Sequence, residues 1–253
     1  MNHFTDLNGK RALVTGASQG IGRCIAEAFG ACGAEVAVHY RGNEEMAGDV
    51  VRAIDSTGGK GFAVQADLGD GDSIRRLAEE IAGHWDALDL LVNNAGDMVA
   101  RSRLAEADDA LMEKVLKLNL TGCIDVTRRL IPLLERGNEP AIINLTSIAA
   151  YSGGQGGVSL YASAKGGMVA LTRSLAQELG PAIRVNGIAP GVIITNIHRD
   201  TTPEMLERVA GRTALGRNGR PEECVGAALL LAGPAGSFIT GEIIHVNGGL
   251  WMA

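Results

Sequence analysis

The chain has 253 residues, which is long enough for one large α/β domain or two small ones. Hydrophobic residues make up 46% and charged residues 21%, a composition that is typical of a folded globular protein and argues against a disordered one. The net charge of −6 and the lack of a basic stripe argue against nucleic acid as a partner.

Neither the first residues nor the cysteines indicate a membrane or secreted protein. MNHFTDLNGKR lacks the apolar run of a signal peptide, and no later stretch approaches the ~18 consecutive apolar residues of a membrane span. Cys24, Cys32, Cys123 and Cys224 form no Cys-x-x-Cys pair, so we interpret them as reduced thiols and not as metal ligands or nucleophiles. We therefore expect a cytoplasmic protein without bound metal and without membrane contact.

Short β-branched runs alternate with longer amphipathic stretches along the chain. Runs such as AIINLT are almost wholly apolar, as in strands of a parallel sheet that is buried on both faces. The alternation predicts an α/β chain with a Rossmann fold, a doubly wound seven-stranded parallel sheet with helices on both faces. Strands are expected at 11–15, 35–40, 61–66, 88–92, 141–146, 182–188 and 242–246, and helices near 20–32, 43–57, 70–84, 106–134, 160–179 and 221–232.

No Pro-, Gly- or Ser-rich linker divides the chain, so we expect a single domain over 1–253. The segment 195–219 breaks the alternation, since it is long and polar and carries one short helical piece, PEMLERVAG. Such a segment is typical of an insertion that covers a binding site, and we expect it to contact the substrate.

A glycine-rich turn, GASQGIG, follows the first strand and leads into a helix. Gly16, Gly20 and Gly22 let the backbone turn sharply and approach a pyrophosphate, which would lie at the helix N-terminus. The spacing is Gly-x-x-x-Gly-x-Gly, not the common Gly-x-Gly-x-x-Gly. A tight strand–helix joint without a ligand would also need glycines, but the position after the first strand favours a dinucleotide.

The end of the second strand, VAVHYRGNEE, bears on the choice of dinucleotide. NAD-binding strands end in a carboxylate that holds the adenosine ribose, whereas Tyr40 occupies that position here. Arg41 follows and could grip a 2′-phosphate, although an exposed arginine at a strand end could also be solvated. The missing acid favours NADP(H), with NAD(H) as the alternative.

Polar pairs follow the third and fourth strands, at the edge of the sheet where ligands bind in α/β proteins. These are Asp67-Leu68 and the run Asn93-Asn94-Ala95-Gly96, although such clusters also make ordinary turns. Further along, Tyr161 and Lys165 lie four residues apart in LYASAKGG, on one face of an expected helix. A nearby cation would lower the phenol pKa below its usual ~10, so the pair could exchange a proton with a substrate, or be a plain surface or core pair.

These motifs together resemble the short-chain dehydrogenases/reductases over essentially the whole chain. TGASQGIG, Asp67-Leu68, NNAG, Asn119, Ser147, YASAK and PGVIIT occur in the family's order. The resemblance implies an NAD(P)-dependent oxidoreductase in which Tyr161 protonates the carbonyl oxygen as hydride arrives. Lys165 would lower the phenol pKa and bind the nicotinamide ribose, and Ser147 would polarise the substrate oxygen. Asn119 would support a water that leads to Lys165, or would only tie its helix to the backbone.

The resemblance also implies the cofactor contacts. The glycine-rich turn would hold the pyrophosphate, Arg41 the 2′-phosphate, the Asp67-Leu68 pair the adenine, and the turn at 190–195 the nicotinamide end. Two departures are Gln19, where many NADP-using relatives carry a basic residue, and the 14-residue step from Ser147 to Tyr161, one longer than is common in the family. The predicted cofactor-binding residues are Gly16, Ser18, Gln19, Gly20, Ile21, Gly22, Arg41, Asp67, Leu68, Asn93, Ala95, Gly96, Tyr161, Lys165, Pro190, Gly191, Ile193 and Thr195.

The substrate remains open between two classes. The chain resembles 3-oxoacyl-acyl-carrier-protein reductases, but LLERGNEPAI and Gln177 stand where those reductases often carry basic residues for their acidic partner. The alternative is a sugar, a uronate or a small keto-acid. Arg101, Arg103, Gln155 and His198 could bind its carboxylate or hydroxyls, or could be solvated. A regulator without catalysis would lose the Asn, Ser, Tyr and Lys set, and a hydrolase would need a Gly-x-Ser-x-Gly elbow that LTSIA does not offer.

By the same resemblance, the C-terminal run SFITGEIIHVNGGLWMA and the long helices near 106–134 and 160–179 would form subunit interfaces. We expect a homotetramer with dihedral symmetry, or a homodimer.

Overall fold

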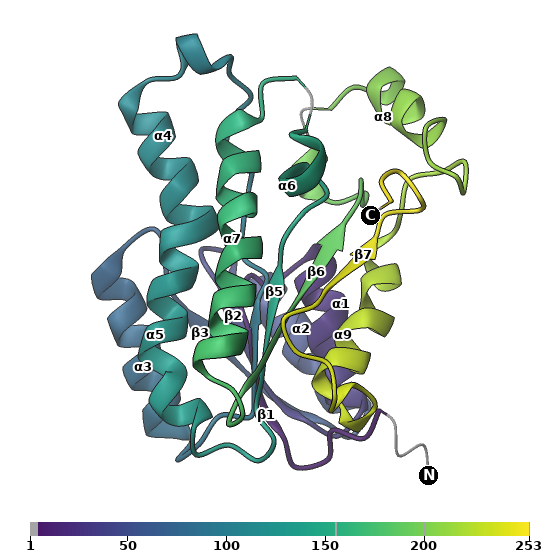
Figure 1. Ribbon diagram of the computed structural model, residues 1–253. Coiled ribbons are helices and arrows are strands. Elements are labelled where there is room, and N and C mark those ends of the chain that lie inside the picture. The colour runs from purple at the N-terminus through teal and green to yellow at the C-terminus, as the bar shows by residue number, and fades with distance from the viewer. Residues whose placement is uncertain (1–4, 155, 200, 253) are drawn as a thin grey trace.

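The computed structural model describes residues 5–154, 156–199 and 201–252. Seven strands form one parallel sheet in the order β3-β2-β1-β4-β5-β6-β7 (Figure 1). The strand order reverses between β1 and β4, so the sheet is doubly wound, as predicted. The strands are β1 (Arg11–Val14), β2 (Glu35–Tyr40), β3 (Lys60–Gln65), β4 (Leu90–Asn93), β5 (Ala141–Leu145), β6 (Arg184–Pro190) and β7 (Ile243–Val246).

Helices cover both faces of the sheet (Figure 1). The first face packs against α1 (Gly20–Ala31), α2 (Glu44–Ser56) and α9 (Val225–Ala232). The second face packs against α3 (Gly71–His84), α5 (Gly122–Leu134) and α7 (Ser159–Glu178). This arrangement confirms the predicted fold.

Two hydrophobic cores, one on each face, hold these layers together. Successive side chains of a strand point to opposite faces, so Val14 belongs to the core with α1 and α2, and Leu13 belongs to the core with α3 and α5. All residues of β5 are buried, as its unbroken apolar sequence predicts. The buried sheet therefore fixes the positions of the residues that follow the carboxyl ends of its strands.

The helix boundaries follow local side-chain chemistry. Asn43 accepts a hydrogen bond from the Met46 N–H at the start of α2, and Asp70 accepts one from Ser73 at the start of α3. The expected helix at 221–232 begins as the 3₁₀ turn η4 (Pro221–Cys224) before α9.

The expected helix at 106–134 is interrupted. It consists of α4 (Asp109–Leu116), a π-helical turn η2 (Lys117–Thr121) and α5. An extra residue in the turn shifts the hydrogen-bond ladder, and such π turns occur often at functional sites. Asn119 lies in the middle of this one.

Three short elements stand over the carboxyl edge of the sheet. The helix α6 (Ala149–Ser152), which the sequence did not predict, follows β5. Within the segment 195–219 lie η3 (Asn196–His198) and α8 (Pro203–Ala210), the latter at the predicted PEMLERVAG. No helix within the described residues combines the length and apolar character needed to cross a lipid bilayer.

Candidate active site

The carboxyl ends of the strands open into one long cavity of about 700 Å³. It begins at the glycine-rich turn after β1, passes the ends of β4 and β5 and finishes beneath α8. This is the edge where open α/β sheets bind their ligands. The predicted cofactor residues that line it are Gly16, Ser18, Gln19, Gly20, Ile21, Arg41, Leu68, Ala95, Gly96, Tyr161, Lys165, Pro190, Gly191, Ile193 and Thr195.

The glycines of the first turn meet two different requirements. Gly16 and Gly20 have φ of +61° and +58°, a backbone region that other residues rarely adopt, and both line the cavity. Gly22 instead packs against the loop after β4, because an added Cβ would lie 2.3 Å from Asn94 Nδ2. The structure places Gly22 outside the cavity lining, where it lets α1 approach that loop closely.

His39, on β2, holds the glycine-rich turn in place and was missed from the sequence. Its Nδ1 accepts a hydrogen bond from the Gly16 N–H at 2.9 Å, and its Nε2 lies 3.1 Å from the Ala66 carbonyl oxygen. Nδ1 must therefore be unprotonated and Nε2–H donates. Burial lowers the pKa of His39 to about 4, so the ring is neutral at pH 7. The sequence could have singled out His39, because it is a polar ring within the mostly apolar strand EVAVHY.

Arg41 and Gln19 lie at the nucleotide end of the cavity and differ in their partners. Among the described residues, no hydrogen bond or ion pair engages the Arg41 guanidinium, while its backbone oxygen accepts a bond from Gln65 Nε2 at 2.7 Å. Gln19 Oε1 accepts a hydrogen bond from Asn196 Nδ2 at 2.6 Å. Gln19 therefore joins the glycine-rich turn to η3, and Arg41 is the cation available to a ligand there.

The two asparagines at the end of β4, Asn93 within the strand and Asn94 directly after it, have separate roles. Asn93 is buried within the fold, where its Nδ2 donates to Thr127 Oγ1 at 3.0 Å and Asn144 Oδ1 at 2.9 Å. Asn94 lines the cavity, and its Nδ2 donates to the Thr15 carbonyl at 2.8 Å. Asn93, predicted to bind the cofactor, thus lies outside the lining, and Asn94 takes the position at the cavity.

The Asp67-Leu68 pair is divided in the same way. Leu68 lines the cavity together with Ala66, as expected for an adenine wall. Asp67 does not, because its carboxylate accepts the Gly69 N–H at 2.8 Å and stabilises the turn that precedes α3.

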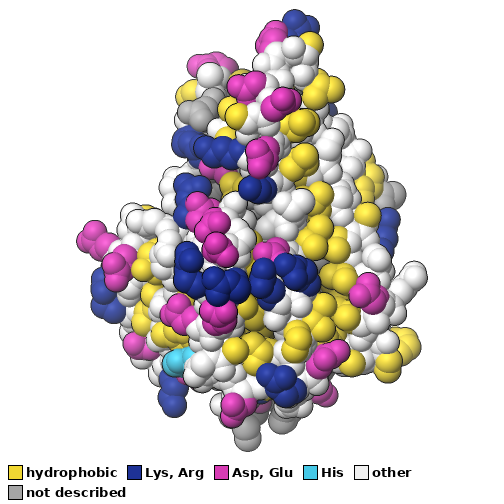
Figure 2. Space-filling view, turned by 90° about the vertical axis from the view of Figure 1, so that its left-hand side faces the viewer, with side chains coloured by type: hydrophobic (Ala, Val, Ile, Leu, Met, Phe, Trp, Pro, Cys, Tyr) yellow, Lys and Arg dark blue, Asp and Glu magenta, His cyan; other side chains and the backbone are white. Residues whose placement is uncertain are grey.

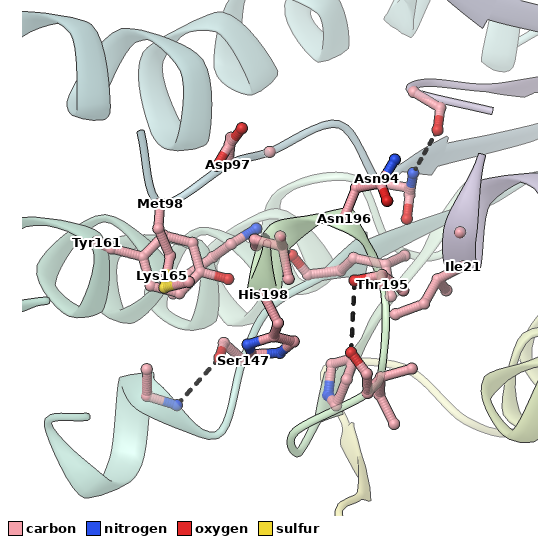
Figure 3. A pocket seen from close by; sticks show the side chains of 18 of the residues that line it. Ile21, Asn94, Asp97, Met98, Ser147, Tyr161, Lys165, Thr195, Asn196 and His198 are labelled. Atoms are coloured by element: carbon pink, nitrogen blue, oxygen red, sulfur yellow. Dashed lines mark hydrogen bonds between the residues drawn. The ribbon is translucent and has the colours of Figure 1, made fainter. Parts of the chain in front are cut away.

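Ser147, Tyr161 and Lys165 lie together beyond the end of β5 (Figure 3). The Lys165 ammonium is buried, donates a hydrogen bond to the Leu145 carbonyl at 2.7 Å and lies 5.7 Å from the centre of the Tyr161 ring. The i, i+4 spacing on α7 therefore brings the acid and the cation to one wall, as the sequence indicates.

Burial is the main influence on the pKa values of this pair. Burial raises the pKa of Tyr161 to about 12, although the hydrogen bond with Ser147 lowers it, and the charge of Asp97 raises it further. Burial also lowers the pKa of Lys165 to about 8. Desolvation dominates the pKa of Tyr161 in this structure, where the Lys165 ammonium is hydrogen-bonded to the Leu145 carbonyl, and the expected lowering of the phenol pKa by Lys165 stays a prediction. Tyr161 is fully protonated at neutral pH and suited to donate a proton.

Asn119 supports the site from behind and does not line the cavity. From η2, its Oδ1 accepts the Asp97 N–H at 3.1 Å, and its Nδ2 donates to the carbonyl oxygens of Asp97 at 2.8 Å and Val115 at 2.9 Å. A Cβ added to Gly96 would lie 2.7 Å from Asn119 Oδ1 and 3.3 Å from Lys165 Nζ, so Gly96 fits between them. These bonds fasten the turn η2 to the loop at Asp97. The role of Asn119 in supporting a water that leads to Lys165 stays a prediction.

The long step between Ser147 and Tyr161 is absorbed by a glycine-rich loop. Gly153, Gly154, Gly156 and Gly157 all have positive φ, between +69° and +78°. Such a loop can take up one more residue without moving its ends. Ser147 and Tyr161 accordingly still line the same part of the cavity.

The segment 195–219 covers the cavity and is fastened to it by polar contacts. Arg199 Nη1 lies 3.0 Å from Asp97 Oδ2, and Asn196 bonds Gln19 as described. Of the residues considered for substrate binding, Arg101 and His198 line the cavity, Arg103 does not, and Gln155 lies outside the described residues. Within the described chain, no group of three or more His, Cys, Asp or Glu side chains is arranged to hold a metal ion.

A doubly wound sheet that carries Ser147, Tyr161 and Lys165 beside a glycine-rich turn defines a class of oxidoreductase. The family model described as enoyl-(acyl carrier protein) reductase matches residues 16–251. The chain belongs to this family, within the short-chain dehydrogenases/reductases, and acts on carbonyl or alcohol groups.

Relatives at similar distance carry several activities in their names. The 3-oxoacyl-[acyl-carrier-protein] reductase FabG of Staphylococcus aureus is 37% identical over 248 residues, which are 96% of this chain and 98% of that one. The Pseudomonas aeruginosa RhlG/NADP active-site complex is 36% identical with a TM-score of 0.91, and 99% of each chain is covered. An NADH-dependent reductase, A1-R′, responsible for alginate metabolism, is 32% identical with a TM-score of 0.90, over 99% of this chain and 100% of that one.

Proposed function

We propose that the chain transfers hydride between NADP(H) and a ketone or its secondary alcohol. The observation that carries this proposal is one cavity that joins the Gly16 turn, with Arg41 beside it, to Ser147, Tyr161 and Lys165. The cofactor, when bound, supplies or accepts the hydride. The protein residues position the substrate and handle the proton.

Tyr161 is the proton donor in the direction of reduction. Its raised pKa keeps the phenol protonated, and the hydroxyl of Ser147, which lines the same part of the cavity, holds the same substrate oxygen. Lys165 is charged below its pKa of about 8 and stabilises the phenolate that remains. Asn119 fixes the loop that contains Gly96 and, in our proposal, supports the water through which Lys165 recovers a proton.

The nucleotide end favours NADP(H) over NAD(H). Arg41 presents an unengaged guanidinium among the described residues, and no carboxylate occupies position 40 to hold a free ribose 2′-hydroxyl. The RhlG complex contains NADP, whereas A1-R′ is named as NADH-dependent, so the fold accepts both cofactors in relatives. We base the proposed preference of this chain for NADP(H) on Arg41.

Two substrate classes fit this mechanism. The first is a 3-oxoacyl thioester, including one on acyl carrier protein, because FabG reductases are 37% identical. The second is a sugar, a uronate or a small keto-acid, which is favoured by the polar residues Arg101, His198 and Arg212 on the outer cavity wall and by the likeness to A1-R′.

The test is NADPH oxidation with a panel of acetoacetyl thioesters, keto-sugars, uronates and keto-acids. Activity with at least one ketone, abolished in Tyr161→Phe, is the expected result. Full turnover by Tyr161→Phe, or no reduction of any ketone with either cofactor, would reject the proposal.

We also propose a homotetramer, or a homodimer, built on the face formed by α4 and α5. Figure 2 shows apolar side chains gathered beside a band of basic ones on that side of the molecule. Met112 on α4 and Ile124 on α5 are 42% and 36% exposed, although large apolar side chains prefer to be covered. Light scattering of the purified chain tests the assembly. The four free cysteines suit a reducing compartment, and the cytoplasm is our proposal for it.

A further inference from the structure

The helix α8 turns an apolar face toward the outer part of the cavity. All of its residues are described, and those that line the cavity are Met205, Leu206 and Val209. Met205 and Val209 share one face because they are four positions apart. The charged residues of the helix stay outside the lining, namely Glu204, Glu207 and Arg208. The helix is therefore amphipathic, and its apolar side faces the space beyond the reacting groups.

This apolar face is not covered by the rest of the fold. A surface helix normally buries its apolar stripe against the core. Here no residue of the fully described α8 is buried, and Met205 is 41% exposed. A polar contact helps to hold the helix in place, since Asn218 Nδ2 donates to the Leu206 carbonyl at 3.0 Å. Exposed apolar side chains on the wall of a cavity indicate a surface that an apolar part of a ligand covers.

Met98, on the loop after β4, adds a second apolar wall, and a strained turn fixes its position. Val99 has a φ of +65°, which a β-branched residue rarely adopts. Its N–H donates to Asp97 Oδ1 at 3.1 Å, and the Ala100 N–H donates to the Met98 carbonyl at 2.8 Å. Such strain persists where the surroundings impose it, often at ligand sites. The Met98 side chain extends from this turn toward Tyr161 (Figure 3).

Further apolar side chains connect these walls with the reacting groups. Ile148 directly follows Ser147, and Val158 lies three residues before Tyr161, at the start of α7. Both line the same cavity, as does Leu250 near the C-terminus. The polar side chains of the outer wall come from the flanking loops and not from α8. An apolar surface therefore runs without a break in the cavity from the catalytic residues to α8.

We propose that Met98, Met205 and Val209 form an apolar subsite that holds an unbranched alkyl chain attached to the reacting ketone. The inference rests on the proposed function and favours the first of its substrate classes. A 3-oxoacyl group carries such a chain, whereas a sugar, a uronate or a small keto-acid has none of comparable length. Methionine side chains are flexible and polarisable, so they adapt to chains of different length. Binding of the chain removes apolar surface from water on both partners, which favours longer chains.

The first test measures kcat/KM for the NADPH-dependent reduction of methyl 3-oxobutanoate, methyl 3-oxohexanoate and methyl 3-oxooctanoate. Each added CH2 that enters the apolar subsite should raise kcat/KM about threefold to fourfold, so each two-carbon step should raise it about tenfold. Met205→Gln keeps the length of the side chain but makes it polar. This variant should reduce the gain from the shortest to the longest ester by about tenfold.

Glu207→Gln is the matched control, because it introduces the same amide on the same helix but outside the cavity lining. It should keep the full gain with chain length. Wild type without any gain, or equal gains in Met205→Gln and Glu207→Gln, would overturn the apolar subsite.

The second test needs no turnover and separates this inference from the proposed function. It measures the Kd of butanamide, hexanamide and octanamide by calorimetry, with and without NADPH, because an amide resembles the ketone but does not accept hydride. The Kd should fall about tenfold with each two-carbon step, and Met205→Gln should remove most of this fall. A Kd that is independent of chain length would refute the apolar subsite even if ketones are reduced. A Kd that falls as expected without reduction of any ketone would refute only the proposed reaction.

Discussion

Replacing His39 should weaken both folding and cofactor binding, because this ring joins three segments at the nucleotide end. Its two nitrogens engage the Gly16 N–H, in a partly buried bond, and the buried Ala66 carbonyl. In His39→Leu both backbone groups lose their partner. The loss of partners at one buried group and one partly buried group costs up to about 2–5 kcal/mol of unfolding free energy. In His39→Asn the side-chain oxygen can still accept from Gly16, so about half of that loss should return.

The same ring gives the fold a defined dependence on pH. The pKa of His39 is about 4 in the folded protein against 6.5 for the ordinary side chain, because burial opposes the charge. Between these values the unfolded chain binds a proton that the folded chain does not. Stability is therefore complete above pH 6.5 and falls as the pH drops toward 4. At about 1.4 kcal/mol per pH unit, this one group removes about 3 kcal/mol by pH 4.

Denaturant unfolding of wild type, His39→Asn and His84→Asn between pH 7.5 and 4.5 measures this effect. His84 on α3 is exposed and serves as the matched control. We expect the unfolding free energy to depend less on pH in His39→Asn than in wild type, and to be unchanged in its pH dependence in His84→Asn. His39→Leu should also bind NADPH with a higher Kd. Identical pH profiles for wild type and His39→Asn would refute the argument that His39 is neutral and bonded through both nitrogens.

Three further changes test the proposed mechanism. Tyr161→Phe should fold and bind NADPH but lose about 10²–10⁴-fold in kcat, and near-normal turnover in a reductase assay would contradict its role as acid. Arg41→Asp should raise the KM for NADPH about tenfold or more and shift the preference toward NADH. Steady-state kinetics with both cofactors measures this shift. An unchanged preference would show that the 2′-phosphate binds elsewhere. The reduction rate should fall above pH 8 as Lys165 loses its proton, and Lys165→Arg should move that limb to higher pH; an unmoved limb would assign it to another group.

The fold could be predicted from the sequence because its determinants are local and repeated. The predicted strand at 35–40 matches β2 in full, and the caps Asn43 and Asp70 mark the starts of α2 and α3. The carboxyl edge of a parallel sheet then places the glycine-rich turn and the residues after β4 and β5 side by side. The juxtaposition of Ser147 and Tyr161 follows from that edge and from one helix.

What the sequence could not supply depends on contacts between distant segments. His39 gains its role from Gly16 and Ala66, which belong to two other segments. The pKa of Tyr161 depends mainly on how deeply the finished fold buries the phenol, which the spacing from Lys165 does not reveal. Periodicity showed the helix at 106–134 but not its π turn, which is where Asn119 bonds the loop at Asp97.

The two asparagines at the end of β4 show that a difference of one residue is enough to exceed what the sequence can predict. Asn93 is the last residue of β4, and its side chain turns inward to Thr127 and Asn144, on α5 and β5. The next residue, Asn94, leaves the strand and reaches the Thr15 carbonyl at the cavity. Because adjacent residues of a strand face opposite ways, a shift of one position exchanges a structural amide for one beside the cofactor site. Asn93→Ala should therefore lower stability more than cofactor affinity, and Asn94→Ala should do the reverse, which unfolding and NADPH titration together can decide.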